Sequence, residues 1–224
     1  MKRTKLSDRV LPNYSLYEEL FNAISHGCGV VLGIAVFILC MQKSVLSASC
    51  SAVIGSVIYG LSMIILYLIS TLYHAFKPST GKQVFRIIDH CTIYLLIAGT
   101  YTPITLCCFF PDVPTVGWAI LILQWGISAI AITLNAIDLK RYRVFSYTSY
   151  IVLGWAILFF APLAWKYIDN TGLLYIFLGG VSYTVGAILF AIGSKKAWFH
   201  SAFHVFVVIG SFLQFIGIYG YILP

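Results

Sequence analysis

Residues 50–74, which read CSAVIGSVIYGLSMIILYLISTLYH, contain no aspartate, glutamate, lysine or arginine. A helix needs about 20 consecutive apolar residues to cross the hydrocarbon core of a bilayer. The segment therefore predicts a membrane-spanning helix. Its last turn carries two polar side chains, Ser70 and His74, whose spacing of four residues places them on one helix face.

Six further apolar segments of similar length surround this one. Their approximate bounds are 21–42, 85–109, 115–137, 145–166, 172–194 and 198–222. Pro103 and Pro162 lie inside the third and fifth segments and are expected to kink them. Short loops separate the segments, so consecutive helices should be antiparallel neighbours. We predict an all-α integral membrane protein, with residues 1–20 as a cytoplasmic N-terminal segment and residues 21–224 as a seven-helix bundle.

The composition agrees with this interpretation. Of the 224 residues, 60% are hydrophobic and only 9% are charged, whereas a soluble domain is about half apolar and about a quarter charged. The formal net charge of +7 is spread over several short loops, which argues against a nucleic-acid partner. The first twenty residues are polar, so no cleavable signal peptide is expected. Most of the six cysteines lie in apolar segments, where free cysteine packs as a small hydrophobe.

Lysine and arginine are divided unequally between the two ends of the predicted bundle. Twelve of the 14 lie in the N-terminal segment and in the second, fourth and sixth loops, and only Lys43 and Lys166 lie at the other end. Loops rich in lysine and arginine stay in the cytoplasm. This bias predicts a multi-pass protein of the plasma (inner) membrane with a cytoplasmic N-terminus and an external C-terminus, and it requires an odd number of spans.

Five polar residues are expected at one depth, near the cytoplasmic ends of their helices. They are Ser70, His74, Asp89, His200 and His204. Ionisable side chains at membrane depth are costly and usually serve a site. Two histidines four residues apart share a helix face and can bind one metal ion together. The alternative is that each histidine hydrogen-bonds to a carbonyl of a neighbouring helix.

The chemistry of zinc gives these residue types a use. Three neutral imidazoles that leave one coordination position open are typical of a catalytic zinc site, and a water in that position has its pKa lowered to about 7. Asp89 is the candidate base for this water, or it orients a ligand imidazole; alternatively, it forms an ion pair with Arg86. Ser70 is the candidate group that polarises a substrate carbonyl, or its hydroxyl bonds only to its own helix.

Further polar residues are expected at the edge of this site. Glu19, Asn22 and His26 share roughly one face of the first span, where they line the mouth of the site or link helices. On a helix, the side chain of His90 points about 100° away from that of Asp89. We therefore expect His90 to lie beside the site and not to be a fourth ligand. Tyr94 is expected to pack in the bundle at the edge of the site.

Four stretches of the chain resemble the bacterial hemolysin III proteins, relatives of the progestin and adipoQ receptor (PAQR) family. The stretches are residues 18–27 (EELFNAISHG), 70–74 (STLYH), 89–103 (DHCTIYLLIAGTYTP) and 198–204 (WFHSAFH). The resemblance implies seven helices, a cytoplasmic N-terminus and a Zn²⁺ ion held by three histidines. Those histidines carry over to His74, His200 and His204. It also implies that Asp89 lies beside the bound water, with Ser70 nearby.

A wider group of similar proteins includes the alkaline ceramidases. The leading hypothesis is therefore a zinc-dependent membrane hydrolase of a lipid amide or ester bond, acting on a sphingolipid-like or fatty-acyl substrate near the cytoplasmic side. Two alternatives stay open: a non-enzymatic regulator or sensor of membrane lipid state with structural zinc, and a hemolysin-type pore-forming cytolysin. The cytolysin is the weaker alternative, because a secreted toxin is soluble before insertion and this chain is apolar throughout. The sequence leaves the oligomeric state open.

Overall fold

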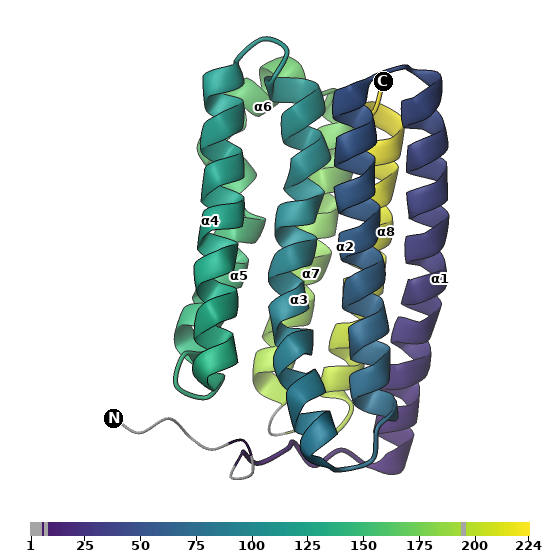
Figure 1. The fold of residues 1–224 in the computed structure, drawn as a ribbon, viewed down its shortest axis with the longest axis vertical. Helices are drawn as coiled ribbons and strands as arrows, with labels where there is room; N and C mark the ends of the chain where they lie inside the picture. Colours follow the sequence, from purple (N-terminus) through teal and green to yellow (C-terminus); the bar gives the residue numbers. More distant parts are fainter. Residues whose placement is uncertain (1–5, 7–8, 194–195) are drawn as a thin grey trace.

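The structure, a computed structural model, describes residue 6, residues 9–193 and residues 196–224 (Figure 1). These described residues contain helices and no β-strand. The elements in chain order are α1 (Leu16–Leu46), α2 (Cys50–Ala75), α3 (Thr80–Ile104), the π-helical η2 (Thr105–Phe109), α4 (Pro114–Asp138), α5 (Arg143–Gly154), the 3-10 helix η3 (Ala156–Phe160), α6 (Ala161–Tyr167), α7 (Asn170–Gly193) and α8 (Phe199–Tyr221).

Six of the described helices are long and apolar enough to cross a membrane, counting η2 with α3. A seventh crossing results if α5 and the segment η3–α6 form one span, since the two meet at a bend of 42°. In Figure 1 the first helix, α1, begins at the lower end and the last, α8, finishes at the upper end, as an odd number of crossings requires. The predicted all-helical membrane bundle is confirmed. Its first helix begins at Leu16, earlier than the expected residue 21.

The early start of α1 has a local cause. The Ser15 hydroxyl accepts a hydrogen bond from the backbone N–H of Glu18, and the Glu18 carboxylate accepts one from the backbone N–H of Ser15. This capping box satisfies N–H groups that the first turn of a helix leaves unpaired. Ser49 and Ser79 cap α2 and α3 through their side chains. Serines therefore determine where three of the helices around the site begin.

The fifth span is broken before its proline. Helix α5 ends at Gly154, and η3 and α6 follow after Trp155. Pro162 lies in the first turn of α6, where proline is tolerated because first-turn N–H groups have no partner within the helix. The kink expected at Pro162 is therefore located earlier, at Trp155. Pro103 does lie inside α3, and the helix continues directly into the π-helical η2.

Two antiparallel helix pairs, α1 with α2 and α7 with α8, make the most extensive contacts of the bundle, and α8 also packs on α1 (Figure 1). Two glycines of α1, Gly29 and Gly33, permit the close approach of α1 to α2. A Cβ atom at Gly29 would collide with the ring of Tyr67, and one at Gly33 would lie 3.1 Å from Cγ1 of Ile64. Small residues at such contacts let membrane helices gain van der Waals contact between their backbones.

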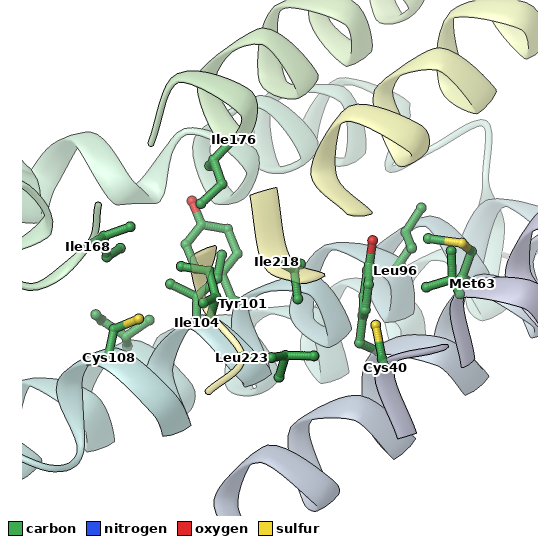
Figure 2. Packing of buried hydrophobic residues seen from close by; sticks show 14 of the residues in the cluster. Cys40, Met63, Leu96, Tyr101, Ile104, Cys108, Ile168, Ile176, Ile218 and Leu223 are labelled. Atoms are coloured by element: carbon green, nitrogen blue, oxygen red, sulfur yellow. The ribbon is translucent and has the colours of Figure 1, made fainter. Parts of the chain in front are cut away.

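The centre of the bundle combines apolar packing with hydroxyl groups. Apolar side chains such as Met63 and Ile218 fill it from several helices (Figure 2). The hydroxyl of Tyr67 donates to Oγ of Ser211 at 2.7 Å, and the same Oγ lies 2.8 Å from the hydroxyl of Tyr183. Such bonds satisfy polar groups that cannot reach water within a bilayer. They hold α2 and α8 in register, which matters because these two helices carry the histidines described below.

Candidate metal centre

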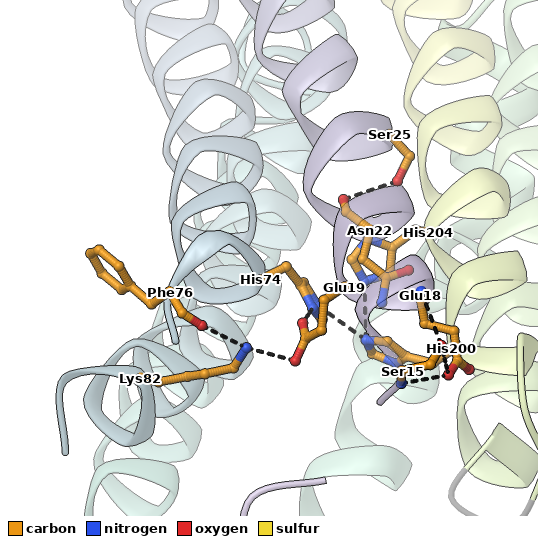
Figure 3. Close-up of polar contacts among 10 residues, drawn as sticks. All are labelled: Ser15, Glu18, Glu19, Asn22, Ser25, His74, Phe76, Lys82, His200 and His204. Carbon is orange, nitrogen blue, oxygen red and sulfur yellow. Dashed lines mark hydrogen bonds and ion pairs between the residues drawn. The ribbon is translucent and has the colours of Figure 1, made fainter. Parts of the chain in front are cut away.

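Three histidines meet at the lower end of the bundle. His74 lies in the last turn of α2, and His200 and His204 lie in the first two turns of α8. Nε2 of His200 lies 3.3 Å from Nε2 of His74 and 3.1 Å from Nε2 of His204 (Figure 3). All three side chains are buried. Their ligand atoms lie within 4.8 Å of one another, so a single metal ion could contact all three.

The donor set and its spacing fit Zn²⁺. Two nitrogen ligands of a tetrahedral zinc, each about 2.0–2.1 Å from the ion, lie about 3.3 Å apart. The two measured Nε2–Nε2 distances, 3.3 and 3.1 Å, are close to this value. A neutral imidazole has one N–H and one lone pair, so three nitrogens that face one another cannot all be satisfied by sharing protons. One divalent cation would be a partner for all three lone pairs.

Glu19 of α1 orients His74. Its Oε2 lies 2.7 Å from Nδ1 of His74, and its Oε1 accepts a hydrogen bond from Nζ of Lys82 at 2.6 Å (Figure 3). Because a carboxylate only accepts, we assign the His74 proton to Nδ1, which leaves the Nε2 lone pair facing the other histidines. Lys82 is buried and also donates to the carbonyl of Phe76 at 3.0 Å. The spacing along α1 predicts Glu19 near the site, whereas no sequence pattern points to Lys82.

Ser70 and Asp89 line one end of a cavity of about 320 Å³. Ser70 comes from α2 and Asp89 from α3. His26, a direct neighbour of His204, lines the same cavity. From there the cavity continues between α3, α5, α7 and α8, past aliphatic and aromatic side chains, as far as Gln214. The structure thus brings a carboxylate and a hydroxyl from two helices to the cavity end nearest the histidines.

His26 and Asn22 add two buried side chains from α1. The ring of His26 stacks on the ring of His204, with centroids 3.7 Å apart and planes inclined by 25°, and it meets the Tyr67 ring edge-on at 5.0 Å. Asn22 is fully buried, and its amide atoms have no hydrogen-bond partner among the described residues. Helix α1 therefore contributes to the site in two ways, by ring packing at His26 and by a hydrogen bond at Glu19.

His90 and Tyr94 make their contacts beside the histidine cluster. Nδ1 of His90 lies 2.9 Å from a backbone carbonyl oxygen of α3. Its ring contacts Phe190 at 5.9 Å, and Phe190 in turn contacts His200 at 5.5 Å. The hydroxyl of Tyr94 lies 2.7 Å from Oγ of Ser149, which links α3 to α5. Neither residue belongs to the group whose ligand atoms converge.

Tyr14 reaches the histidines from the segment before α1. Its ring stacks on His200, with centroids 4.8 Å apart and planes inclined by 15°, and its centroid lies 5.9 Å from that of His74. Burial raises the pKa of the Tyr14 hydroxyl well above its usual value, so the phenol stays protonated at neutral pH. No spacing rule could have identified Tyr14, because residues 9–15, which precede α1, are not helical and have no regular periodicity.

Comparison with known proteins gives one family match and three relatives, each of which covers most of the chain. Residues 14–215 match the family described as haemolysin-III related. The chain is 35% identical over 207 residues to Hemolysin-3 of Bacillus cereus, covering 92% of this chain and 93% of that protein. It is 35% identical over 202 residues to the Hemolysin-3 homolog of Bacillus subtilis (strain 168), covering 90% and 93%. It is 26% identical over 214 residues to the monocyte to macrophage differentiation factor of Homo sapiens, covering 92% and 85%.

Proposed function

The chain belongs to the haemolysin III-related family, with weaker homology to the PAQR family, and we propose that it is a zinc-dependent hydrolase of an amide or ester bond in a membrane lipid. One observation carries the proposal. The three converging histidines lie next to an apolar cavity whose nearest end also holds a carboxylate and a hydroxyl. Zinc ligands, a proton-transfer group and an apolar chamber are the parts that hydrolysis of a lipid requires.

The histidines supply the metal-binding part. His74, His200 and His204 would bind the ion through Nε2, with the fourth position open. The chemistry that Zn²⁺ supplies when bound is Lewis acidity toward a carbonyl oxygen and a lowered pKa, about 7, for a water ligand. Glu19 holds the His74 ring in the tautomer that presents Nε2, since its carboxylate faces Nδ1 at 2.7 Å.

Asp89 and Ser70 would act on the substrate and its protons. The Asp89 carboxylate takes a proton from the attacking water and passes it to the departing amine or alcohol. The Ser70 hydroxyl, which lines the cavity together with Asp89, offers a donor to the substrate carbonyl. Both side chains line the cavity, so a carbonyl group inside it reaches them without crossing bulk water.

The cavity supports a lipid as the substrate. Most of its wall is aliphatic or aromatic, with residues such as Ile97, Tyr101 and Val207, which suits a fatty-acyl or sphingolipid-like chain. Its volume of about 320 Å³ lies within the range of about 300–1,000 Å³ that small-molecule sites occupy. We assign the site to the cytoplasmic side of the plasma membrane. In support, Lys43 in the last turn of α1 and Lys166 in the last turn of α6 are the only described lysines or arginines near the opposite end of the bundle.

A regulator of membrane lipid state with structural zinc is the second candidate. The polar contacts around the histidines join four helices, since Glu19 lies on α1, His74 on α2, Lys82 on α3 and His200 on α8. A metal ion at this junction would stabilise the arrangement without any turnover, because binding energy at a site that exists only in the folded state is folding energy. Lipid binding in the cavity would then act by changing helix packing.

Zinc content and lipid turnover, measured on the same protein, test both candidates. Protein in mild detergent is examined by elemental analysis, and in bilayer discs it receives a panel of ceramides and fatty-acyl esters, with released fatty acid measured by mass spectrometry. A hydrolase contains about one zinc per chain and releases fatty acid. The double variant His200→Ala/His204→Ala loses both properties. Asp89→Asn keeps the zinc and loses turnover by at least about 100-fold, because it removes the proton-transfer group.

His90→Ala is the matched control for metal content. Its Nδ1 hydrogen-bonds to a backbone carbonyl, so this variant keeps its zinc. Stoichiometric zinc without fatty acid from any lipid of the panel would support the regulator and contradict the hydrolase. Folded wild-type protein that contains no zinc after gentle purification would contradict both candidates.

A further inference from the structure

Residues 9–15, which we call the strap, run across the lower end of the bundle to the start of α1 (Figure 1). Arg86 and Gln83 of α3 donate hydrogen bonds to two carbonyl oxygens of the strap, at 2.8 and 2.9 Å. Nη2 of Arg9 donates to the carbonyl of Ile137 in α4 at 2.7 Å. The strap is thus held against α3 and α4 by bonds that can break without disturbing a helix.

Tyr14 is the strap residue that covers the metal ligands. Its ring is parallel to that of His200 within 15° and lies 5.9 Å from that of His74. The third ligand, His204, is covered instead by the ring of His26 at 3.7 Å. Among the aromatic rings that contact the three histidines, one therefore comes from the strap and one from α1. Only the ring on the strap is carried by a segment outside the helices.

Capping of α1 does not account for this position of Tyr14. Ser15 and Glu18 cap the helix by themselves. Tyr17, in the first turn of α1, is 74% exposed. A tyrosine in this part of the chain is therefore not buried in every position. The ring of Tyr14 lies against those of His200 and His74, and the nitrogen of His74 that faces Glu19 is held by that carboxylate.

We propose that Tyr14 closes the metal site toward the aqueous phase at this end of the bundle, and that the strap must lift before the ion exchanges. This inference rests on the proposed function, because it requires the three histidines to bind Zn²⁺. Tyr14 is not among the residues that line the apolar cavity. Metal and lipid thus reach the site by separate routes, and the strap governs the rate of metal uptake and release.

The test compares the rates of zinc exchange in wild type, Tyr14→Ala and Tyr14→Phe. Release from zinc-loaded protein is followed by absorbance after addition of excess chromogenic chelator, and uptake by the metal-free protein is followed from a zinc buffer. Tyr14→Ala should release and take up zinc about tenfold faster or more, because the local opening no longer breaks the stacking on His200. Tyr14→Phe keeps the ring and should exchange at the wild-type rate.

Tyr17→Ala is the matched control, since it removes an exposed tyrosine three residues away, and it should exchange zinc at the wild-type rate. Gln83→Ala tests the strap through its attachment to α3. It removes one hydrogen bond to the strap and leaves Tyr14 unchanged, and it should speed exchange by a smaller factor. This variant keeps the inference testable if Tyr14→Ala fails to fold.

The measured exchange rates distinguish a Tyr14 that covers the metal site from a Tyr14 with another role. Equal exchange rates in wild type and Tyr14→Ala, with stoichiometric zinc in both, would overturn the inference and leave the proposed function intact. Faster release with unchanged uptake would also overturn it, because that result indicates a weakened ligand set rather than an opened route. If wild type, Tyr14→Phe and Tyr17→Ala all fold and none binds zinc, the proposed function itself fails.

Discussion

Oε2 of Glu19 lies 2.7 Å from Nδ1 of His74, although the two residues are 55 positions apart in the chain. The contact couples the first turn of α1 to the last turn of α2. A hydrogen-bonding partner on the far nitrogen of a metal-binding histidine fixes the tautomer and raises the basicity of the ligand. Lys82 holds the other oxygen of the same carboxylate at 2.6 Å, so the orientation of His74 depends on three helices.

Replacing Glu19 should weaken zinc binding without removing it. In Glu19→Gln the hydrogen-bond partner of His74 loses its charge, and the affinity of the protein for Zn²⁺ should fall about 10- to 100-fold. Competition against a fluorescent zinc chelator measures the change. Glu18→Gln is the control, because Glu18 bonds to Ser15 and to the backbone N–H of Trp198. That variant should lower thermal stability and keep wild-type affinity; equal affinities in the two variants would contradict the role of Glu19.

Removing the metal should destabilise the wild-type protein. An ion that binds only the folded state adds about 4 kcal/mol when its free concentration is about 1,000 times the dissociation constant. Thermal unfolding of detergent-solubilised protein, followed by intrinsic fluorescence, should therefore shift to lower temperature when a chelator is added. The double variant His200→Ala/His204→Ala should unfold at the same temperature with and without chelator. A wild-type midpoint that does not respond to chelation would count against a tightly bound metal.

Two neighbouring glycines of α1 should respond in opposite directions to alanine. A Cβ at Gly29 would collide with the Tyr67 ring, whereas one at Gly27 meets no atom within 4 Å. Gly29→Ala should destabilise the fold by about 1–3 kcal/mol through overpacking, and Gly27→Ala should be neutral or stabilising by about 0.4–1 kcal/mol. Chemical unfolding in mixed micelles measures both. The same sign for the two variants would contradict the close approach of α1 to α2.

Acid should remove one contribution to stability at the start of α7. Oδ1 of Asp169 accepts hydrogen bonds from the backbone N–H groups of Thr171 at 2.7 Å and Gly172 at 3.3 Å, and the Thr171 bond in particular lowers the pKa of the Asp169 carboxyl. Because this pKa is lowered, the carboxylate contributes its full stabilisation at pH values above the ordinary pKa of 3.8. That stabilisation is lost as the pH falls through the folded-state pKa.

The difference in melting temperature between wild type and Asp169→Ala measures this contribution. It should be constant near neutral pH and disappear in acid. A difference that grows as the pH falls would show that the carboxylate does not stabilise this helix start.

The histidine spacing shows how far local patterns predict the site. His200 and His204 are one turn apart, so any helix through these residues places them on one face, and in the structure their Nε2 atoms lie 3.1 Å apart. Ser70 and His74 share a face for the same reason. The approach of Ser70 and His74 to α8 was predicted from a common depth in the membrane. Such an inference gives no distance, and it does not decide which other residues hold the histidines in place.

Lys82 and Tyr14 show where such prediction ends. Lys82 has the sequence context of an ordinary basic loop residue, yet it is buried against Glu19. Tyr14 precedes α1 in a segment without periodicity, yet its ring covers His200. The break of the fifth span was expected at Pro162 and occurs at Trp155. For Lys82 and Tyr14, contacts with residues distant in the chain decided the outcome.

The sequence by itself determined an all-helical membrane bundle with paired polar residues near the helix ends, because apolar length and a four-residue spacing are properties of single segments. Only the tertiary structure decided that α1, α2, α3 and α8 combine Glu19, His74, Lys82, His200 and His204 into one cluster. It also decided that Tyr14 closes over that cluster. The physical reason is that helix packing and the path of a non-helical segment depend on interactions between parts of the chain far apart in sequence.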